Sequence, residues 1–150
     1  MINTQASADQ PEDRTKPLCS VLVVDDEKDF VQTLVKRLHR RGVVCEGVFT
    51  GEEAVKKITE RKFDIVLLDM KLPGMDGNTT LIEIKKIRTD TQVIILTGHA
   101  SANEGLEGMK NGAIDYLMKP VEFESLYEKL LKAVNKIDGS HNSSVIDRRK

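Results

Sequence analysis

The chain has 150 residues, a formal net charge of −1 and 39% hydrophobic side chains, which suits one globular domain. The balanced charge gives no broad basic surface for nucleic acid or a membrane, and no apolar run approaches the roughly 20 residues of a membrane span. Residues 1–17 contain no apolar segment of the secretory type. We therefore expect a cytoplasmic protein without direct nucleic-acid or membrane binding, in which Cys19 and Cys45 are reduced, small hydrophobic residues.

Polar segments flank a central domain. Residues 1–17 and 138–150 lack any apolar period, so we expect a disordered leader and a flexible tail around a domain at 18–137. Within this domain, short apolar runs rich in β-branched residues predict five strands. The runs cover residues 20–24, 43–48, 64–68, 92–96 and 115–118.

A segment with helical periodicity follows each predicted strand. The first ends near Gly42, and the second begins at the capping box of Thr50 and Glu53. The third covers about 77–88, and the fifth runs from 123 to 137. The fourth begins at a second capping box and carries an apolar stripe that we expect to be buried; these residues are Ser101 with Glu104, and then Ala102, Leu106, Met109 and Ala113.

Five strand–helix units in this order predict an α/β fold with a parallel sheet between two layers of helices. The expected arrangement is the flavodoxin-like (βα)5 three-layer sandwich with strand order 2-1-3-4-5. In this order the first and third strands are neighbours, and the carboxyl ends of all five strands meet at one edge.

Charged residues stand at three of these carboxyl ends. Asp25 and Asp26 follow the first strand, Asp69 follows the third, and Lys119 follows the fifth. Carboxylates that meet at one edge repel each other unless a cation joins them. We therefore predict a divalent-metal pocket that contains a reactive aspartate and a neighbouring lysine.

The residues around these positions resemble the receiver domain of two-component response regulators over roughly 19–137. The matching motifs are Val-Val-Asp25-Asp26-Glu27, Leu-Leu-Asp69-Met-Lys-Leu-Pro73-Gly74-Met-Asp-Gly77, Leu96-Thr97-Gly98 and Asp115-Tyr116-Leu-Met-Lys119-Pro120. The resemblance implies the same fold and a phosphoryl group supplied by a sensor histidine kinase or a phosphotransfer protein. It implies no enzymatic turnover beyond self-catalysed phosphoryl transfer and autodephosphorylation.

The resemblance also implies individual roles around a magnesium ion. Asp69 would be the phosphoacceptor. Mg²⁺ would be bound directly by Asp26, by Asp69 and by the backbone carbonyl of Lys71, whereas Asp25 would orient a metal-bound water. Hard oxygen ligands of this kind suit Mg²⁺. In this family the residues at the positions of Lys71 and His99 influence how fast the acyl phosphate hydrolyses.

Four further residues complete the expected site. Lys119 would pair with Asp69 and later with the phosphoryl group, and its bond to Pro120 would be cis. Thr97 would be the switch hydroxyl that binds a phosphoryl oxygen, and Tyr116 the aromatic residue that turns inward with it. Gly98 is expected to leave the mouth of the site open.

Phosphorylation is expected to change the surface formed by the fourth helix, the fifth strand and the fifth helix. This face would bind a downstream protein or a second copy of the chain. Its candidate members are Met109, Tyr116, Phe123 and Tyr127, of which Met109 fits the core better. No output-domain pattern follows residue 137, so the chain is either a single-domain regulator or a receiver cut from a longer protein.

Two alternatives stay open at this stage. A pseudo-receiver would bind a partner without phosphorylation, but it should lack one of the acids, the threonine or the lysine. A phosphatase of the haloacid-dehalogenase type would need a second aspartate two positions after Asp69, where this chain has Lys71.

Overall fold

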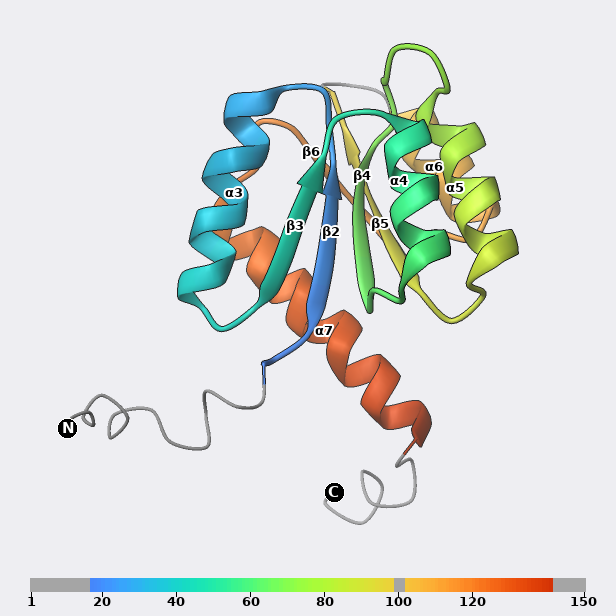
Figure 1. The fold of residues 1–150 in the computed structure, drawn as a ribbon. Helices are drawn as coiled ribbons and strands as arrows, with labels where there is room; N and C mark the ends of the chain where they lie inside the picture. Colours follow the sequence, from blue (N-terminus) through green and yellow to red (C-terminus); the bar gives the residue numbers. More distant parts are fainter. Residues whose placement is uncertain (1–16, 99–101, 142–150) are drawn as a thin grey trace, which may run out of the picture.

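A computed structural model describes residues 17–98 and 102–141. Almost all of the predicted leader, most of the predicted tail, His99 and Ser101 lie outside the described residues. Five strands alternate with five helices in the part that the structure describes (Figure 1). The strands are β2 (Ser20–Val24), β3 (Val44–Val48), β4 (Ile65–Asp69), β5 (Gln92–Thr97) and β6 (Asp115–Met118). The helices are α3 (Lys28–Arg40), α4 (Gly51–Glu60), α5 (Gly77–Ile87), α6 (Ala102–Lys110) and α7 (Phe123–His141).

The sheet is parallel and has the order β3-β2-β4-β5-β6, which confirms the flavodoxin-like order 2-1-3-4-5. Val24 is paired with Leu68, and Asp69 is paired with Leu96. The ends of β2, β4 and β5 therefore lie at nearly the same height, and the residues that follow them share one edge.

Both faces of the sheet are covered by helices, and the central strands β2, β4 and β5 are accordingly apolar on both sides. Val23 and Leu67 belong to the core cluster that includes residues of α3 and α7, whereas Val24 and Leu68 belong to the cluster that includes residues of α4 and α5. Figure 1 shows α3 on the opposite side of the sheet from α4 and α5. All four residues are fully buried. This double burial fixes the register of β2 and β4, since a slip by one residue would exchange the two faces.

Local signals place the helices that flank the carboxyl edge. The predicted cap of α4 is confirmed, because Thr50 Oγ1 accepts a hydrogen bond from the Glu53 N–H at 3.0 Å. Asp76 caps α5 in the same way through the Thr79 N–H at 2.8 Å. A side chain on Gly77 would lie 2.3 Å from Met70 Cα, so this glycine lets α5 start directly behind the residue that follows Asp69.

The predicted apolar stripe of α6 is wrong at two of its positions. Leu106 and Met109 are 55% and 39% exposed. Two glycines face the sheet instead: a Cβ on Gly105 would lie 2.7 Å from the Tyr116 ring, and one on Gly108 would lie 2.9 Å from Ile95 Cγ1. The helix packs too closely for larger side chains, so its apolar residues turn outward.

The last helix extends beyond its predicted end. α7 ends at His141 rather than at residue 137, so the helical period seen in the sequence underestimates its length. None of the helices in the described part of the chain is long and apolar enough to cross a membrane. Cys19 and Cys45 are buried and free, as predicted.

Candidate functional site

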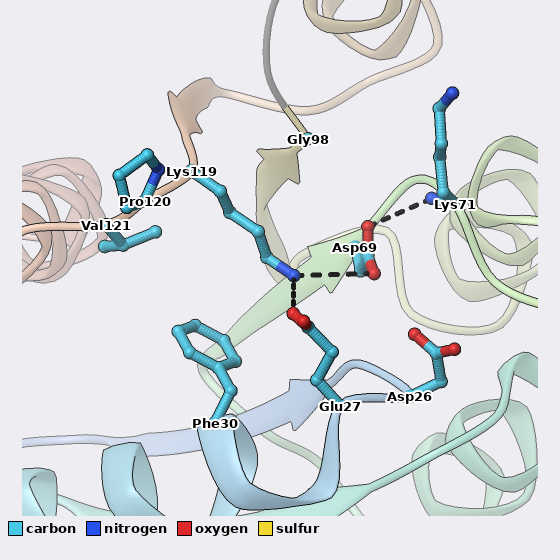
Figure 2. A pocket seen from close by; sticks show the side chains of 9 residues that line it. All are labelled: Asp26, Glu27, Phe30, Asp69, Lys71, Gly98, Lys119, Pro120 and Val121. Atoms are coloured by element: carbon cyan, nitrogen blue, oxygen red, sulfur yellow. Dashed lines mark hydrogen bonds and ion pairs between the residues drawn. The ribbon is translucent and has the colours of Figure 1, made fainter.

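An open cavity of about 790 Å³ lies at the carboxyl edge of the sheet (Figure 2). The residues that line it come from the segments after β2, β4, β5 and β6. They are Asp26, Glu27, Phe30, Asp69, Lys71, Gly98, Lys119, Pro120 and Val121.

The acids on the β2 side differ in exposure. Asp25 extends the sheet by one residue, because its N–H donates to the Val48 carbonyl at 3.2 Å. Its side chain is fully buried, and its Oδ1 accepts a hydrogen bond from the Glu27 N–H at 2.9 Å. Asp26 is exposed and lines the cavity. Asp25 is therefore buried beneath the cavity, whereas Asp26 is exposed at its opening.

Three carboxylates meet at this point, as predicted from the strand ends. Asp25, Asp26 and Asp69 can each offer an oxygen, and these oxygens lie within 4.8 Å of one another. Such a spacing is repulsive without a cation, and the donor set is the all-oxygen set that Mg²⁺ prefers.

Asp69 is the buried carboxylate at the centre of the site. It is the last residue of β4 and is 5% exposed, and its Oδ1 accepts a hydrogen bond from the Lys71 N–H at 3.0 Å. Burial raises the pKa of Asp69 to about 6; the Lys71 N–H opposes this rise, and the charge of Asp25 adds to it. The ionised form is therefore costly even though the charge of Lys119 lowers this pKa, and a further positive charge would stabilise it.

Lys119 reaches the site from the end of β6. Its Nζ lies 2.6 Å from Asp25 Oδ2, 2.8 Å from Glu27 Oε1 and 3.7 Å from Asp69 Oδ2. The expected pair with Asp69 is present, but it is the longest of the three contacts. Burial alone would lower the pKa of Lys119, but the contacts with Asp25 and Glu27 outweigh it and raise this pKa to about 12.

Glu27 lines the site and contacts Lys119, yet its position there was not predicted from the sequence. It occurs in the quoted motif, yet no role was predicted for it. Two signals could have found it: it follows two aspartates directly, and it stands at the start of α3, beside the same edge of the sheet.

The backbone also fixes the lysine. The Lys119 N–H donates to the Thr97 carbonyl at 2.8 Å, and the Lys119–Pro120 peptide is cis, as predicted. The Phe30 ring lies under the ammonium, with its centroid 4.9 Å from Nζ.

Thr97 and Tyr116 lie on the paired strands β5 and β6. Thr97 is fully buried, and its Oγ1 has no hydrogen-bond partner among the residues that the structure describes. Tyr116 is half-buried, and its ring lies against α6 at Gly105. Their coupled movement stays a prediction.

The structure describes two residues at the mouth of the site. Gly98 lines the cavity, and a Cβ on it would point into space with no described atom within 4 Å, so its part in keeping the mouth open stays a prediction. The Lys71 side chain points away from Asp69 in Figure 2, and its Nζ lies 3.6 Å from Glu104 Oε2 on α6.

The comparisons with known proteins agree with this geometry. Residues 21–131 match the family model of the response regulator receiver domain, which covers most of the chain. The chain belongs to this family, and its fold is that of a receiver domain of a two-component response regulator.

Individual relatives are similar to the chain over the same region. It is 37% identical to the transcriptional regulatory protein ZraR of Salmonella typhimurium over 114 residues, or 76% of this chain and 26% of ZraR. It is 32% identical to the two-component response regulator PhoP of Pseudomonas aeruginosa, over 83% of this chain and 56% of PhoP. The chain thus spans about a quarter to a half of the curated relatives it matches.

A solved structure of a CheY-like receiver domain protein from Methanospirillum hungatei has a TM-score of 0.78 and 30% identity, and the match covers 81% of this chain and 98% of that one. NtrX from Brucella abortus, solved with ADP, has a TM-score of 0.79 and 28% identity over 84% of this chain and 29% of NtrX.

Proposed function

We propose that Asp69 accepts a phosphoryl group from a phosphohistidine of a sensor histidine kinase or a phosphotransfer protein. The observation that carries this proposal is the position of its carboxylate, buried between two other aspartates and a lysine at the end of an open cavity. Asp69 can act as a nucleophile here, while the neighbouring aspartates can bind a cation and the lysine can bind the negative phosphoryl group.

The reaction needs little covalent chemistry from the protein. An Asp69 carboxylate oxygen attacks phosphorus, a P–O bond forms as the P–N bond to the donor imidazole breaks, and a mixed anhydride results. The charge on the transferring group is spread over three oxygens, so positioning and charge neutralisation dominate.

Magnesium fits the donor set of this site. Asp26, Asp69 and the backbone carbonyl of Lys71 would hold the ion directly, with Asp25 acting through a water molecule. When bound, Mg²⁺ neutralises the carboxylates and the phosphoryl oxygens.

Lys119 and Thr97 would bind the phosphoryl group after transfer. The ammonium lies 3.7 Å from Asp69 and can move to a phosphoryl oxygen as a point charge. The Thr97 hydroxyl is buried and lacks a partner in the described structure, so a new acceptor would satisfy it. This gain favours the phosphorylated conformation and shifts the population toward it.

The switched surface would be the face of α6, β6 and α7. Leu106, Met109 and Met118 are exposed apolar residues on α6 and β6, and they support a protein contact there. Phe123 fits this face poorly, because it is buried and the Arg37 guanidinium stacks 4.1 Å from its ring on the α3 side. We propose that the partner is a downstream protein or a second copy of the chain.

The two alternatives have little support. A pseudo-receiver should lack a functional group, yet the acids, Thr97 and Lys119 are all in place. A phosphatase needs an acid where Lys71 stands, and that side chain points away from Asp69 (Figure 2).

Intact-mass measurement tests the proposal. Incubation of the purified chain with a small phosphodonor and Mg²⁺ should add one phosphoryl group, and Asp69→Asn should add none. An equal gain in both proteins, or no gain in either, would contradict it. Steady release of phosphate from a phosphomonoester would favour the phosphatase.

A further inference from the structure

We propose that Glu27 is a positioning residue that holds the Lys119 ammonium away from the phosphoacceptor and so limits how strongly Lys119 binds the phosphoryl group. This inference rests on the proposed function of Asp69. It concerns the resting arrangement of one lysine among three carboxylates.

At rest, the Lys119 ammonium lies closer to two other carboxylates than to Asp69. The Nζ atom forms short contacts with Asp25 and Glu27, at 2.6 and 2.8 Å, and a longer one with Asp69, at 3.7 Å. Figure 2 shows the ammonium joined by dashed lines to Glu27 below it and to Asp69 beside it. The lysine is therefore present at the site, but its strongest contacts are directed elsewhere.

The two short contacts of Lys119 differ because Asp25 is buried and Glu27 is largely exposed. Asp25 is fully buried and is held by the Glu27 N–H, so its carboxylate is a fixed anchor for the ammonium. The Glu27 side chain is 63% exposed, whereas that of Lys119 is 17% exposed. Glu27 is thus the exchangeable partner, since water can replace the ammonium at its carboxylate when Lys119 moves.

The competition follows from the position of the ammonium and not from the number of its donors. A lysine ammonium offers three donors, but a phosphoryl oxygen on Asp69 needs one at hydrogen-bond distance, and Nζ lies 3.7 Å from Asp69 Oδ2 at rest. We expect a shift of Nζ toward Asp69 to lengthen its contact with Glu27, the more exposed of its two short partners. Binding of the phosphoryl group by Lys119 would then include the cost of weakening the Glu27 contact.

The Glu27 side chain does not help to hold α3 in the described chain, and its backbone N–H, which holds Asp25, remains in any variant of the side chain. Glu27 is the residue that precedes α3, but its side chain makes no capping hydrogen bond there. Replacing it should leave the start of α3 intact, so variants of Glu27 report on the lysine rather than on folding.

The test uses beryllofluoride with Mg²⁺ as a phosphoryl mimic, measured by calorimetry on the full chain. Glu27→Gln removes the charge, and Glu27→Asp keeps the charge but shortens the side chain by one methylene. Glu60→Gln, at the exposed last residue of α4, is the matched control for the charge change. Thermal unfolding checks that all variants fold.

We expect both Glu27 variants to bind beryllofluoride about two- to fivefold more tightly than the unmodified chain, in line with a partly exposed ion pair. The acyl phosphate on Asp69 should also last longer in both, by intact mass over time. Glu60→Gln should match the unmodified chain.

Two results would overturn the inference. If neither variant changes the affinity, Glu27 does not restrain Lys119. If only Glu27→Gln binds more tightly, the effect is the negative field of Glu27 and not its reach to the lysine. A failure of the proposed function would be distinct, since the unmodified chain would then gain no phosphoryl mass and bind no beryllofluoride.

Discussion

The amino and carboxyl ends of the sheet carry the same types of polar residue, but these residues differ in how their polar atoms are paired. Asp64 precedes β4 and Asp69 ends it. Asp64 Oδ2 accepts hydrogen bonds from the Ser20 N–H at 2.9 Å and the Ser20 hydroxyl at 3.3 Å. Asp69 accepts one backbone hydrogen bond, and its other oxygen lies 3.7 Å from Lys119. One carboxylate is satisfied within the fold, and the other is left for a ligand.

Strand β5 repeats the contrast with threonines. Thr91 precedes the strand, and its hydroxyl donates to the Phe63 carbonyl at 2.9 Å. Thr97 ends the strand, and its hydroxyl has no partner in the described structure. Both are fully buried, so exposure does not explain the difference.

Two partly buried lysines complete the comparison. Lys85 donates to the carbonyls of Thr89 and Thr91 at 2.9 and 2.7 Å, and burial lowers its pKa. Lys119 contacts carboxylates, which raise its pKa. The polar groups compared at the amino end of the sheet are thus paired with hydrogen-bond partners of the fold, whereas at the carboxyl end Thr97 lacks a described partner and Lys119 is shared among carboxylates. The predictions below test this division.

The largest effect concerns the metal. Asp26→Ala should weaken Mg²⁺ binding by about 10- to 100-fold or more, because it removes a direct oxygen ligand. Isothermal calorimetry measures the affinity, and Asp90→Ala, an exposed acid beyond the amino end of β5, is the control. Equal affinities in both variants would contradict the ligand assignment.

The pH dependence of stability should differ between the unmodified chain and Asp69→Asn. The folded-state pKa of Asp69 is raised from 3.8 to about 6, so folding favours the protonated form. Its stabilising contribution is full below about pH 3.8 and is lost as the pH rises through 6, by at most about 3 kcal/mol. Without metal, urea unfolding should show Asp69→Asn gaining relative stability between pH 4 and 7. A difference that does not vary with pH would refute the raised pKa.

Asp64→Ala should destabilise the fold by about 1–2 kcal/mol, because it leaves the partly buried donors of Ser20 without their carboxylate partner. Mg²⁺ affinity should not change. The urea midpoint measures the first effect, and calorimetry measures the second. A loss of metal binding with intact stability would reverse the roles assigned to the two ends of β4.

The smallest effect compares the threonines. Thr91→Val should cost about 1 kcal/mol or somewhat more, since the Phe63 carbonyl loses its donor. Thr97→Val should leave stability unchanged or slightly increased, because no hydrogen bond to a described residue is lost. Thermal unfolding of the two variants side by side checks this order, and equal losses would argue against it.

The sequence predicted the parallel sheet and the meeting of Asp25, Asp26, Asp69 and Lys119, because strand period and strand-end position determine both. It mispredicted α6, since periodicity cannot reveal that Gly105 and Gly108 pack against the sheet. It also could not rank the partners of Lys119, because the reach of a long side chain depends on tertiary distances.

The central claim is that the Asp69 carboxylate becomes the acyl phosphate. Borohydride reduces an acyl phosphate to an alcohol, so phosphorylated chain treated in this way should contain homoserine at position 69, located by peptide mass mapping. Homoserine at position 69 only after incubation with phosphodonor and Mg²⁺ is the predicted result. Reduction at another acid, with Asp69 unmodified, would contradict the account.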